Sequence, residues 1–281
     1  MEIIDAQIHE ATPAAPWSPC LTDDQSAAAG AELAIAAMDA VGVRAAVVNS
    51  LLPTVSAYLA RHPDRFGGLP HAGPQLPLQT SVDEFVAELR GTPGIVGIRL
   101  VIAHPKDASR VEQLRNGAYE PFFAAAEAHR LPVFVLLHGS LRELHHVVRA
   151  HPELVVVVDH LGLFHPPWRS GPEIFDDIPE VLQLAQFPNV ALKLTGAPAL
   201  SERAYPFADL WPHLHTILEG FGVGRLMWGS DFTRCRGHHS YREAVDFLLH
   251  TDELSSADKE ALFAGSIRKW LGWPVPGGAQ P

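Results

Sequence analysis

Cysteine is nearly absent from this 281-residue chain, which contains two cysteines, Cys20 and Cys235, far apart in the sequence. No CxxC pair occurs, so a zinc site built from paired cysteines is excluded and a disulfide framework is not indicated. The sequence also has no apolar run of membrane-spanning length and no basic segment followed by an apolar one near residue 1. We therefore expect a soluble, cytoplasmic protein with reduced cysteines and no membrane partner.

Positive charge is also scarce. The chain has 21 Lys and Arg against 32 Asp and Glu, a formal net charge of −11 and a pI of about 5.8. This balance argues against binding to nucleic acid or to an anionic membrane surface. Apolar residues make up 47% of the chain, enough for a sizeable core, and histidine is abundant at 16 residues.

Apolar, β-branched segments recur along the chain and alternate with stretches of helical spacing. The eight apolar segments are 2–8, 43–49, 65–71, 95–101, 132–138, 154–160, 189–195 and 225–231. Helical spacing occurs at 30–41, 81–90, 119–130, 141–151 and 207–221. This alternation is typical of a parallel sheet covered on both faces, and the eight units predict an α/β fold, a (β/α)8 TIM barrel. A doubly wound open sheet is the alternative.

The domain organisation expected from the sequence is a single barrel over residues 1–281. No linker-like segment divides the chain. A last helix is expected at 256–270, and the Pro- and Gly-rich tail from about 273 is expected to be loose.

Polar side chains gather at the predicted C-terminal ends of the strands, where a TIM barrel has its active site. In chain order they are Gln7, His9, Arg99, His138, Asp159, His160, Lys193 and Asp231. Each has an ordinary structural explanation on its own, such as an aspartate that caps a helix. Together, buried polar groups at converging strand ends would be costly unless they formed a site. We therefore predict an active site at this end of the barrel.

The chemistry of His9, His138, His160 and Asp231 suits a divalent metal ion, because imidazole and carboxylate are ligands for Zn²⁺ or Mn²⁺. Such an ion lowers the pKa of a bound water molecule and polarises a carbonyl group. Asp231 could accept the proton of the water and pass it to the leaving group. The set supports hydrolysis, or decarboxylation of a substrate with a suitable carboxylate.

The order of motifs resembles the amidohydrolase-2 branch of the amidohydrolase superfamily over essentially the whole chain. The motifs are DAxxH at the first strand, GIRL, PVFVLLHG, VVVVDHLG, NVALKLTG and LMWGSDF. That branch contains lactonases for sugar lactones, pyrone dicarboxylate and muconolactones, and decarboxylases of the aminocarboxymuconate semialdehyde and resorcylate type. The resemblance implies metal ligands at His9 and His138. It also implies a histidine that positions or activates water at His160, and a ligand or general base at Asp231.

Gln7 departs from the family's usual pattern, which is His-x-His on the first strand. A carboxamide oxygen is a weaker, neutral ligand, so Gln7 disfavours tight Zn²⁺ binding even if it completes a set with His9, His138 and Asp231. The resemblance also extends to lactonases thought to work without metal, through basic residues and a base like Asp231. Gln7 could instead donate a hydrogen bond to a substrate oxygen.

Cations at or just after the strand ends favour an anionic small-molecule substrate, because guanidinium pairs bidentately with carboxylate. These cations are Arg99, Lys193, Arg234 and Arg236. The loop 161–177 is expected to fold over the site and to supply aromatic surface, together with the first loop. The residues concerned are Phe164, Trp168, Arg169 and Trp17.

Three functions compete at this stage. The preferred one is a lactonase-like hydrolase that opens a cyclic ester of a carboxylate-bearing molecule, with Asp231 and His160 catalytic and Arg99, Lys193, Arg234 and Trp168 binding substrate. The second is a metal-dependent decarboxylase of an aromatic or muconate-like acid. Such an enzyme usually needs a tightly bound metal ion. The third is a non-catalytic barrel that binds an anionic ligand, against which the joint presence of His160 and Asp231 argues. Because barrels of this family commonly pair, we also expect a homodimer.

Overall fold

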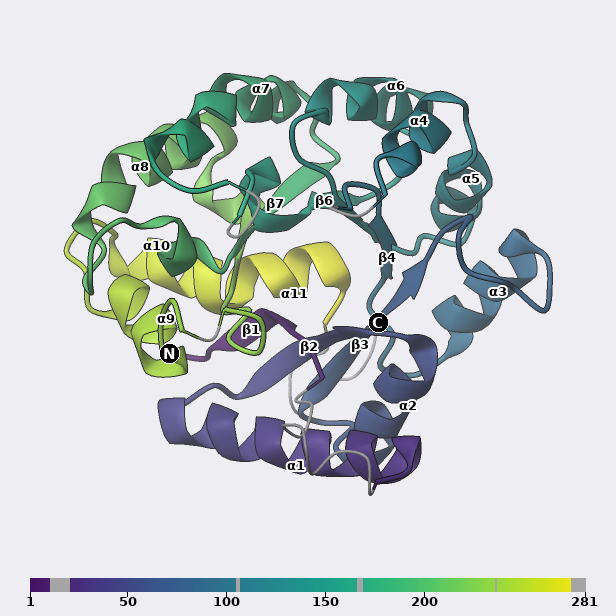
Figure 1. The fold of residues 1–281 in the computed structure, drawn as a ribbon, viewed down its shortest axis with the longest axis horizontal. Coiled ribbons are helices and arrows are strands. Elements are labelled where there is room, and N and C mark those ends of the chain that lie inside the picture. The colour runs from purple at the N-terminus through teal and green to yellow at the C-terminus, as the bar shows by residue number, and fades with distance from the viewer. Residues whose placement is uncertain (11–20, 105–106, 166–168, 236, 274–281) are drawn as a thin grey trace.

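A computed structural model of the chain describes residues 1–10, 21–104, 107–165, 169–235 and 237–273. Eight strands form one sheet in sequence order, with neighbours parallel (Figure 1). They are β1 (Ile4–Ile8), β2 (Ala45–Ser50), β3 (Phe66–Ala72), β4 (Ile98–Val101), β5 (Val133–Leu136), β6 (Val156–Val158), β7 (Val190–Thr195) and β8 (Leu226–Gly229). Each strand overlaps one of the eight segments expected from the sequence. The predicted TIM barrel is confirmed.

Contacts between β1 and the end of β8 bring the two edges of the sheet together. The buried Asp5 carboxylate accepts hydrogen bonds from the Gln7 main-chain nitrogen at 3.0 Å, from the Ser230 main-chain nitrogen at 2.8 Å and from Ser230 Oγ at 2.5 Å. The Asp231 main-chain nitrogen donates to the Gln7 carbonyl oxygen at 3.0 Å. These bonds place Gln7 and Asp231 side by side although 224 residues separate them in the sequence.

Helices surround the sheet on its outer side, apart from the last one, α11 (Ser266–Leu271), which crosses one end of the barrel (Figure 1). They are α1 (Asp23–Val41), α2 (Leu52–Arg61), α3 (Val82–Gly91), α4 (Ser109–Arg115), α5 (Glu120–Ala128), α6 (Leu144–Ala150), α7 (Ile178–Gln183), α8 (Trp211–Phe221), α9 (Tyr241–Leu249), α10 (Ser256–Glu260) and α11 (Ser266–Leu271). Capping boxes fix where four of them begin, because a serine or threonine accepts from the main chain of a residue whose side chain bonds back. The pairs are Thr22–Gln25, Ser81–Glu84, Ser240–Glu243 and Ser255–Asp258.

The last helix differs in detail from the single helix expected at 256–270. It is divided into α10, a π-helical turn at Ala261–Gly265, and α11. Ile267 and Leu271 of α11 pack with Ile4 of β1 and Ala45 of β2, the early residues of the strands. This end of the chain therefore lies next to the end of the barrel opposite the predicted active site.

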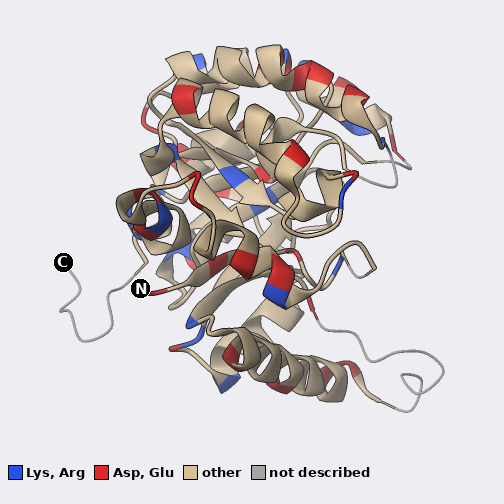
Figure 2. Ribbon diagram, turned by 90° about the vertical axis from the view of Figure 1, so that its left-hand side faces the viewer, with Lys and Arg blue, Asp and Glu red and all other residues tan. Residues whose placement is uncertain are grey.

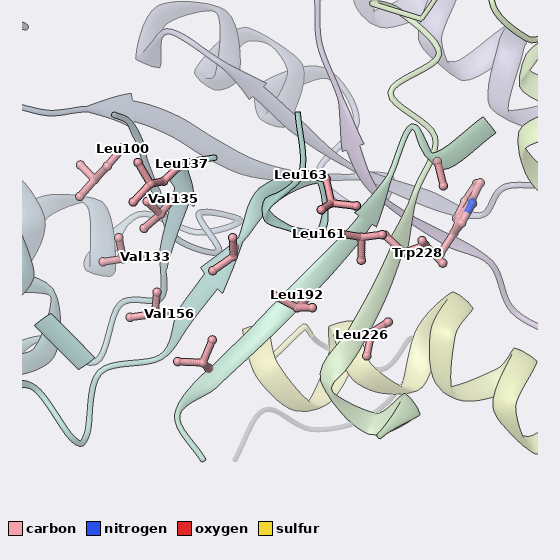
Figure 3. Packing of buried hydrophobic residues seen from close by; sticks show 14 of the residues in the cluster. Leu100, Val133, Val135, Leu137, Val156, Leu161, Leu163, Leu192, Leu226 and Trp228 are labelled. Carbon is pink, nitrogen blue, oxygen red and sulfur yellow. The ribbon is translucent and has the colours of Figure 1, made fainter. Parts of the chain in front are cut away.

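Side chains alternate between the inside and the outside of the barrel along each strand, as strand geometry requires. Phe134, Val157, Ala191 and Met227 belong to an inner apolar cluster. Their neighbours on the same strands pack outward against the helices, and Figure 3 shows part of this outer cluster, including Val133, Val135, Val156, Leu192, Leu226 and Trp228. Two residues further along, the inner positions that follow Val157 and Ala191 are the polar residues Asp159 and Lys193.

An irregularity in β1 changes the alternation of inward and outward side chains just before Gln7 and His9. Its pairing with β2 shifts register between Asp5 and Ile8. Ile4 and Ala6 belong to the inner cluster, whereas Ile8 belongs to the outer one. An extra residue of this kind re-aims the side chains that follow it. The shift gives Gln7 an inward direction directly after Ala6.

Charges on the outside of the molecule are mixed in sign. Figure 2 shows acidic and basic residues interspersed along the helices, with basic segments also lying on the strands. Within the described ranges, no helix has both the length and the apolar character needed to cross a membrane.

Candidate active site

The polar side chains expected at the strand ends form a buried layer inside the barrel, directly above the inner apolar cluster. Asn49 also belongs to this layer, and its expected members that are at most 8% exposed are Gln7, His9, Arg99, Asp159, His160, Lys193 and Asp231. The ammonium group of Lys193 lies 5.0 Å from the ring centroid of Phe134, which marks the boundary between the two layers. The structure therefore brings most of the predicted site residues together.

Asp159 is the anion at the centre of this layer. Its Oδ2 accepts from Arg99 Nε at 2.6 Å, and its Oδ1 lies 2.7 Å from Lys193 Nζ. Burial by itself would raise the pKa of Asp159, but the charges of Arg99 and Lys193 hold it well below its usual range. Burial also lowers the pKa of Lys193, against the influence of Asp159. Two buried cations thus share one buried carboxylate, which leaves the trio with a charge of +1.

The amide of Gln7 connects this trio to the histidines and to Asp231. Lys193 Nζ donates to Gln7 Oε1. Gln7 Nε2 lies 3.3 Å from His160 Nε2 and 3.4 Å from His9 Nε2. Gln7 also opposes the rise in the pKa of the buried Asp231 carboxyl group. Since an ammonium group has no lone pair to offer, Lys193 fixes which end of the amide is oxygen.

His160 is held in one tautomer. Its Nδ1 lies 3.2 Å from the Thr195 carbonyl oxygen, which can only accept, so Nδ1 carries the proton. Burial lowers the pKa of His160 to about 3, so the ring is neutral and Nε2 is free to accept from Gln7. His160 also has a φ of 54°, in the left-handed region that side chains rarely adopt. Strain of this type concentrates at functional sites.

Asp231 shares that unusual backbone conformation, with a φ of 51°. Its Oδ1 lies 3.4 Å from His9 Nε2, and Cys235 Sγ is 3.8 Å from its Oδ2. Burial raises the pKa of Asp231 to about 7, although Gln7 and the nearby cations oppose the shift. Burial also lowers the pKa of His9 well below its usual value, so that ring is neutral. Near neutral pH, Asp231 can therefore both take and release a proton.

Other predicted residues contact groups outside this layer. The ring of His138 packs against Phe164 with centroids 4.0 Å apart, and burial lowers the pKa of His138 to about 4. Arg234 forms an ion pair with Glu10 at 2.6 Å. Arg169 lies over the Phe164 ring and pairs with Asp177 at 3.2 Å. The predictions for Trp17, Trp168, Arg236 and the tail beyond 273 fall outside the described residues.

Two residues of the polar layer were missed from the sequence. His71 Nε2 lies 2.9 Å from the Asn49 amide. In the amide orientation that satisfies both groups, Asn49 donates to His71 and accepts from Arg99 Nη1 at 2.9 Å. Asn49 and His71 stand near the ends of β2 and β3, so the strand-end rule that found the others would have found them. His71 is neutral as well, since burial lowers its pKa to about 3.

The predicted metal ligands do not fit an ion. Among residues 1–10, 21–104, 107–165, 169–235 and 237–273, no group of three His, Cys, Asp or Glu side chains is arranged to hold one. His9 Nε2 and His160 Nε2 both face the amide nitrogen of Gln7, at 3.4 and 3.3 Å. The amide oxygen, which is the atom of Gln7 that could bind a metal, faces the ammonium group of Lys193. Gln7 is therefore the main reason why the predicted metal ligands do not form a metal site.

Comparison with known proteins gives a family match over nearly the whole chain. The model of the family described as "Amidohydrolase" matches residues 4–273. Among solved structures, an amidohydrolase from Burkholderia multivorans with bound zinc shares 21% identity and a TM-score of 0.75, over 98% of this chain and 100% of that one. At 21% identity, the similarity to this solved structure supports the fold alone.

Curated relatives match shorter segments. An L-fucono-1,5-lactonase from Burkholderia ambifaria is 32% identical over 159 residues, which are 54% of this chain and 52% of that protein. A 4-sulfomuconolactone hydrolase from Rhizobium radiobacter is 28% identical over 115 residues, 36% of this chain and 37% of that protein. The chain thus spans about half the length, or less, of the curated relatives it matches.

Proposed function

The chain belongs to the amidohydrolase family, and on that premise we propose that it is a lactonase, which opens a cyclic ester with a water molecule. The observation that carries the proposal is the placement of Asp231. Its buried carboxylate lies 3.4 Å from His9 Nε2 at the end of β8, and its pKa is raised to about 7. The relatives named for lactone hydrolysis support the same class of reaction.

In the proposed reaction, Asp231 is the general base. It removes a proton from water as the water oxygen attacks the lactone carbonyl carbon, and a tetrahedral intermediate forms. The bond from that carbon to the ring oxygen then breaks, and protonated Asp231 returns the proton to the departing alkoxide, which yields a hydroxy acid. A carboxyl group whose pKa is near the working pH can both accept the proton from water and return it to the alkoxide.

Arg99 is the cation we assign to the substrate carbonyl oxygen. It is buried in the same polar layer as His9 and Asp231. A fixed positive charge in a buried site stabilises an oxygen that becomes negative in the transition state. Its bond to Asp159, at 2.6 Å, holds the guanidinium in place.

For the substrate, we propose an uncharged sugar 1,5-lactone in place of the anionic lactone expected from the sequence. The cations on which that expectation depended are occupied by carboxylates of the chain. Arg99 and Lys193 contact Asp159, and Arg234 contacts Glu10. A polyhydroxylated ring can instead exchange hydrogen bonds with neutral groups such as the Asn49 amide and His71. The similarity to the L-fucono-1,5-lactonase of Burkholderia ambifaria points to the same class.

An anionic lactone is the second candidate, and one observation favours it. Arg99 and Lys193 together carry one more charge than Asp159 neutralises, so the inner layer attracts anions weakly. The 4-sulfomuconolactone hydrolase of Rhizobium radiobacter is named for an anionic substrate of this type. The decarboxylase alternative gains no support from these relatives. The non-catalytic alternative does not account for the left-handed backbone conformations of His160 and Asp231.

A substrate panel tests the proposal. Acid release on ring opening is followed with a pH indicator for L-fucono-1,5-lactone, a second aldono-1,5-lactone, a muconolactone and 4-sulfomuconolactone. We expect kcat/KM for the two sugar lactones to exceed that for the two anionic lactones by at least tenfold. The reverse order would reject the sugar lactone and keep lactonase activity. No enzyme-dependent opening of any of the four would count against lactonase activity itself.

We retain the homodimer as a proposal for assembly. Light scattering at micromolar concentration should then give twice the 30.6 kDa mass of the chain, and the mass of one chain would reject it.

A further inference from the structure

The orientation of the Gln7 amide is determined by its neighbours. Gln7 is fully buried. Lys193 Nζ, which can only donate, contacts Oε1 and is itself held by Asp159 at 2.7 Å. The NH₂ group must therefore face the other way, toward His9, His160 and Asp231.

The imidazole lone pair that a metal ion would need is already directed at this NH₂ group. His160 is protonated on Nδ1 because it bonds the Thr195 carbonyl, so its lone pair is on Nε2, 3.3 Å from Gln7 Nε2. His9 Nε2 lies 3.4 Å from the same amide nitrogen and 3.4 Å from Asp231 Oδ1. The amide nitrogen thus lies beside the two imidazole nitrogens that an ion would have to use.

The charge of Lys193 would also repel a metal ion at this position. Zinc-to-nitrogen bonds are about 2.0–2.1 Å long, so an ion between His9 and His160 would have to displace the amide. The displaced amide would leave the ammonium of Lys193, held at 2.7 Å from Asp159, without its neutral acceptor and close to a divalent charge. Like charges this close in a buried site are strongly unfavourable.

From this geometry we propose that the Gln7–Lys193 pair takes the place of a metal ion, so that the site is assembled and works without one. Lys193 supplies the positive charge, and the Gln7 amide links it to His9 and His160, beside Asp231. Gln7 and Lys193 are positioning residues in this arrangement, since they act on the substrate through Asp231 and its neighbours. The inference deepens the proposed function and rests on it for its catalytic meaning.

Zinc binding tests this inference without any substrate. Wild-type protein and the His9→Ala variant are each incubated with excess ZnCl₂ and passed through a desalting column, and the retained zinc is measured by mass spectrometry. Zinc held by surface histidines is common to both proteins, so the difference between them reports the site. We expect that difference to be well below half an ion per chain. One further zinc per chain in the wild type would overturn the inference.

The Gln7→His variant supplies the complementary measurement. It replaces the amide with an imidazole next to His9, His160 and Asp231 and leaves Lys193 paired with Asp159. With the fold checked by circular dichroism, we expect it to retain about one more zinc per chain than the wild type. No gain in a folded variant would mean that the charge of Lys193 excludes the ion without the Gln7 amide, and the proposed role of Gln7 would be dropped. Both results are independent of activity, so they are distinguishable from failure of the lactonase proposal.

Discussion

The ammonium group of Lys193 donates a hydrogen bond to the amide oxygen of Gln7, which joins the seventh strand of the barrel to the first inside the site. This bond explains why a glutamine stands at position 7. The same side chain offers an acceptor to a buried cation and two N–H groups to the histidines on its other side, whereas a neutral imidazole has only one N–H. The bond also makes the stability of the barrel and the arrangement of its site depend on the same two residues.

Lys193→Met should be strongly destabilising. The change preserves length and apolar volume but leaves Asp159 Oδ1 and Gln7 Oε1 buried without their cation. Removing one partner of a buried pair costs about 3–5 kcal/mol. Urea unfolding should show a loss of this size. The control is Arg44→Met, which removes an exposed pair with Asp64 at 3.7 Å and should cost at most about 1 kcal/mol. Equal losses would mean that Lys193 is not a structural centre.

We expect stability to depend on the hydrogen bonds that Asp5 accepts and much less on its negative charge. Asp5→Ala leaves two main-chain donors and the Ser230 hydroxyl unpaired inside the barrel, at about 1–3 kcal/mol for each group that stays buried. Asp5→Asn retains one acceptor oxygen and should lose less than half as much. Thermal unfolding and kcat should follow this order, because the same bonds position Gln7 and Asp231. A variant with alanine as stable as that with asparagine would contradict this role.

The rate should depend on pH through Asp231. Only the ionised carboxylate can act as base, and its pKa is raised to about 7. We therefore expect kcat/KM to fall about tenfold per pH unit well below pH 7 and to reach a plateau above it. His9 and His160 should not add a limb near 6.5, because burial lowers the pKa of both. Initial rates between pH 5 and 8 check this, and a rate that is independent of pH over this range would contradict it.

Stability should fall on acidification below pH 6.5. Among the described residues, burial lowers the pKa of eight histidines: His9, His71, His138, His145, His160, His165, His213 and His239. Below their unfolded pKa of about 6.5, the unfolded chain binds protons that the folded chain refuses, so the free energy of unfolding falls. Asp5, raised to about 6, and Asp231, raised to about 7, act in the opposite direction but are fewer.

The His71→Gln variant isolates one of these contributions. It keeps a polar partner for Asn49 and removes a ring whose pKa is about 3 in the folded chain. Between pH 7 and 5, the variant should lose up to about 2 kcal/mol less than the wild type, the value for one proton over 1.5 pH units. Urea unfolding at the two pH values measures the difference. An identical loss in both proteins would show that His71 does not titrate as described.

The barrel could be predicted from the sequence because its strands are short, apolar and separated by helical stretches. The strand-end rule likewise located Gln7, His9, Arg99, His160, Lys193 and Asp231 in one layer. Which of them touch could not be predicted, since this depends on the register shift in β1 and on bonds between residues far apart in the chain.

The role of the cations is where the sequence was least informative. Arg99, Lys193 and Arg234 were expected to bind an anionic substrate, and nothing in their spacing indicates that Asp159 and Glu10 reach them. The role of Asp5 could not be predicted for a related reason. A carboxylate inside an apolar strand has no recognisable role until the groups that donate hydrogen bonds to it are located in space.

The most direct test of the account is the turnover of the Asp231→Asn variant on the lactone that the wild type opens fastest. Asparagine keeps the size and the hydrogen bonding of the side chain but cannot take a proton. We expect kcat to fall by about 10² or more, the scale of general-base catalysis, with an unchanged circular dichroism spectrum. Turnover within a few-fold of the wild type would show that another group is the base and would contradict the mechanism.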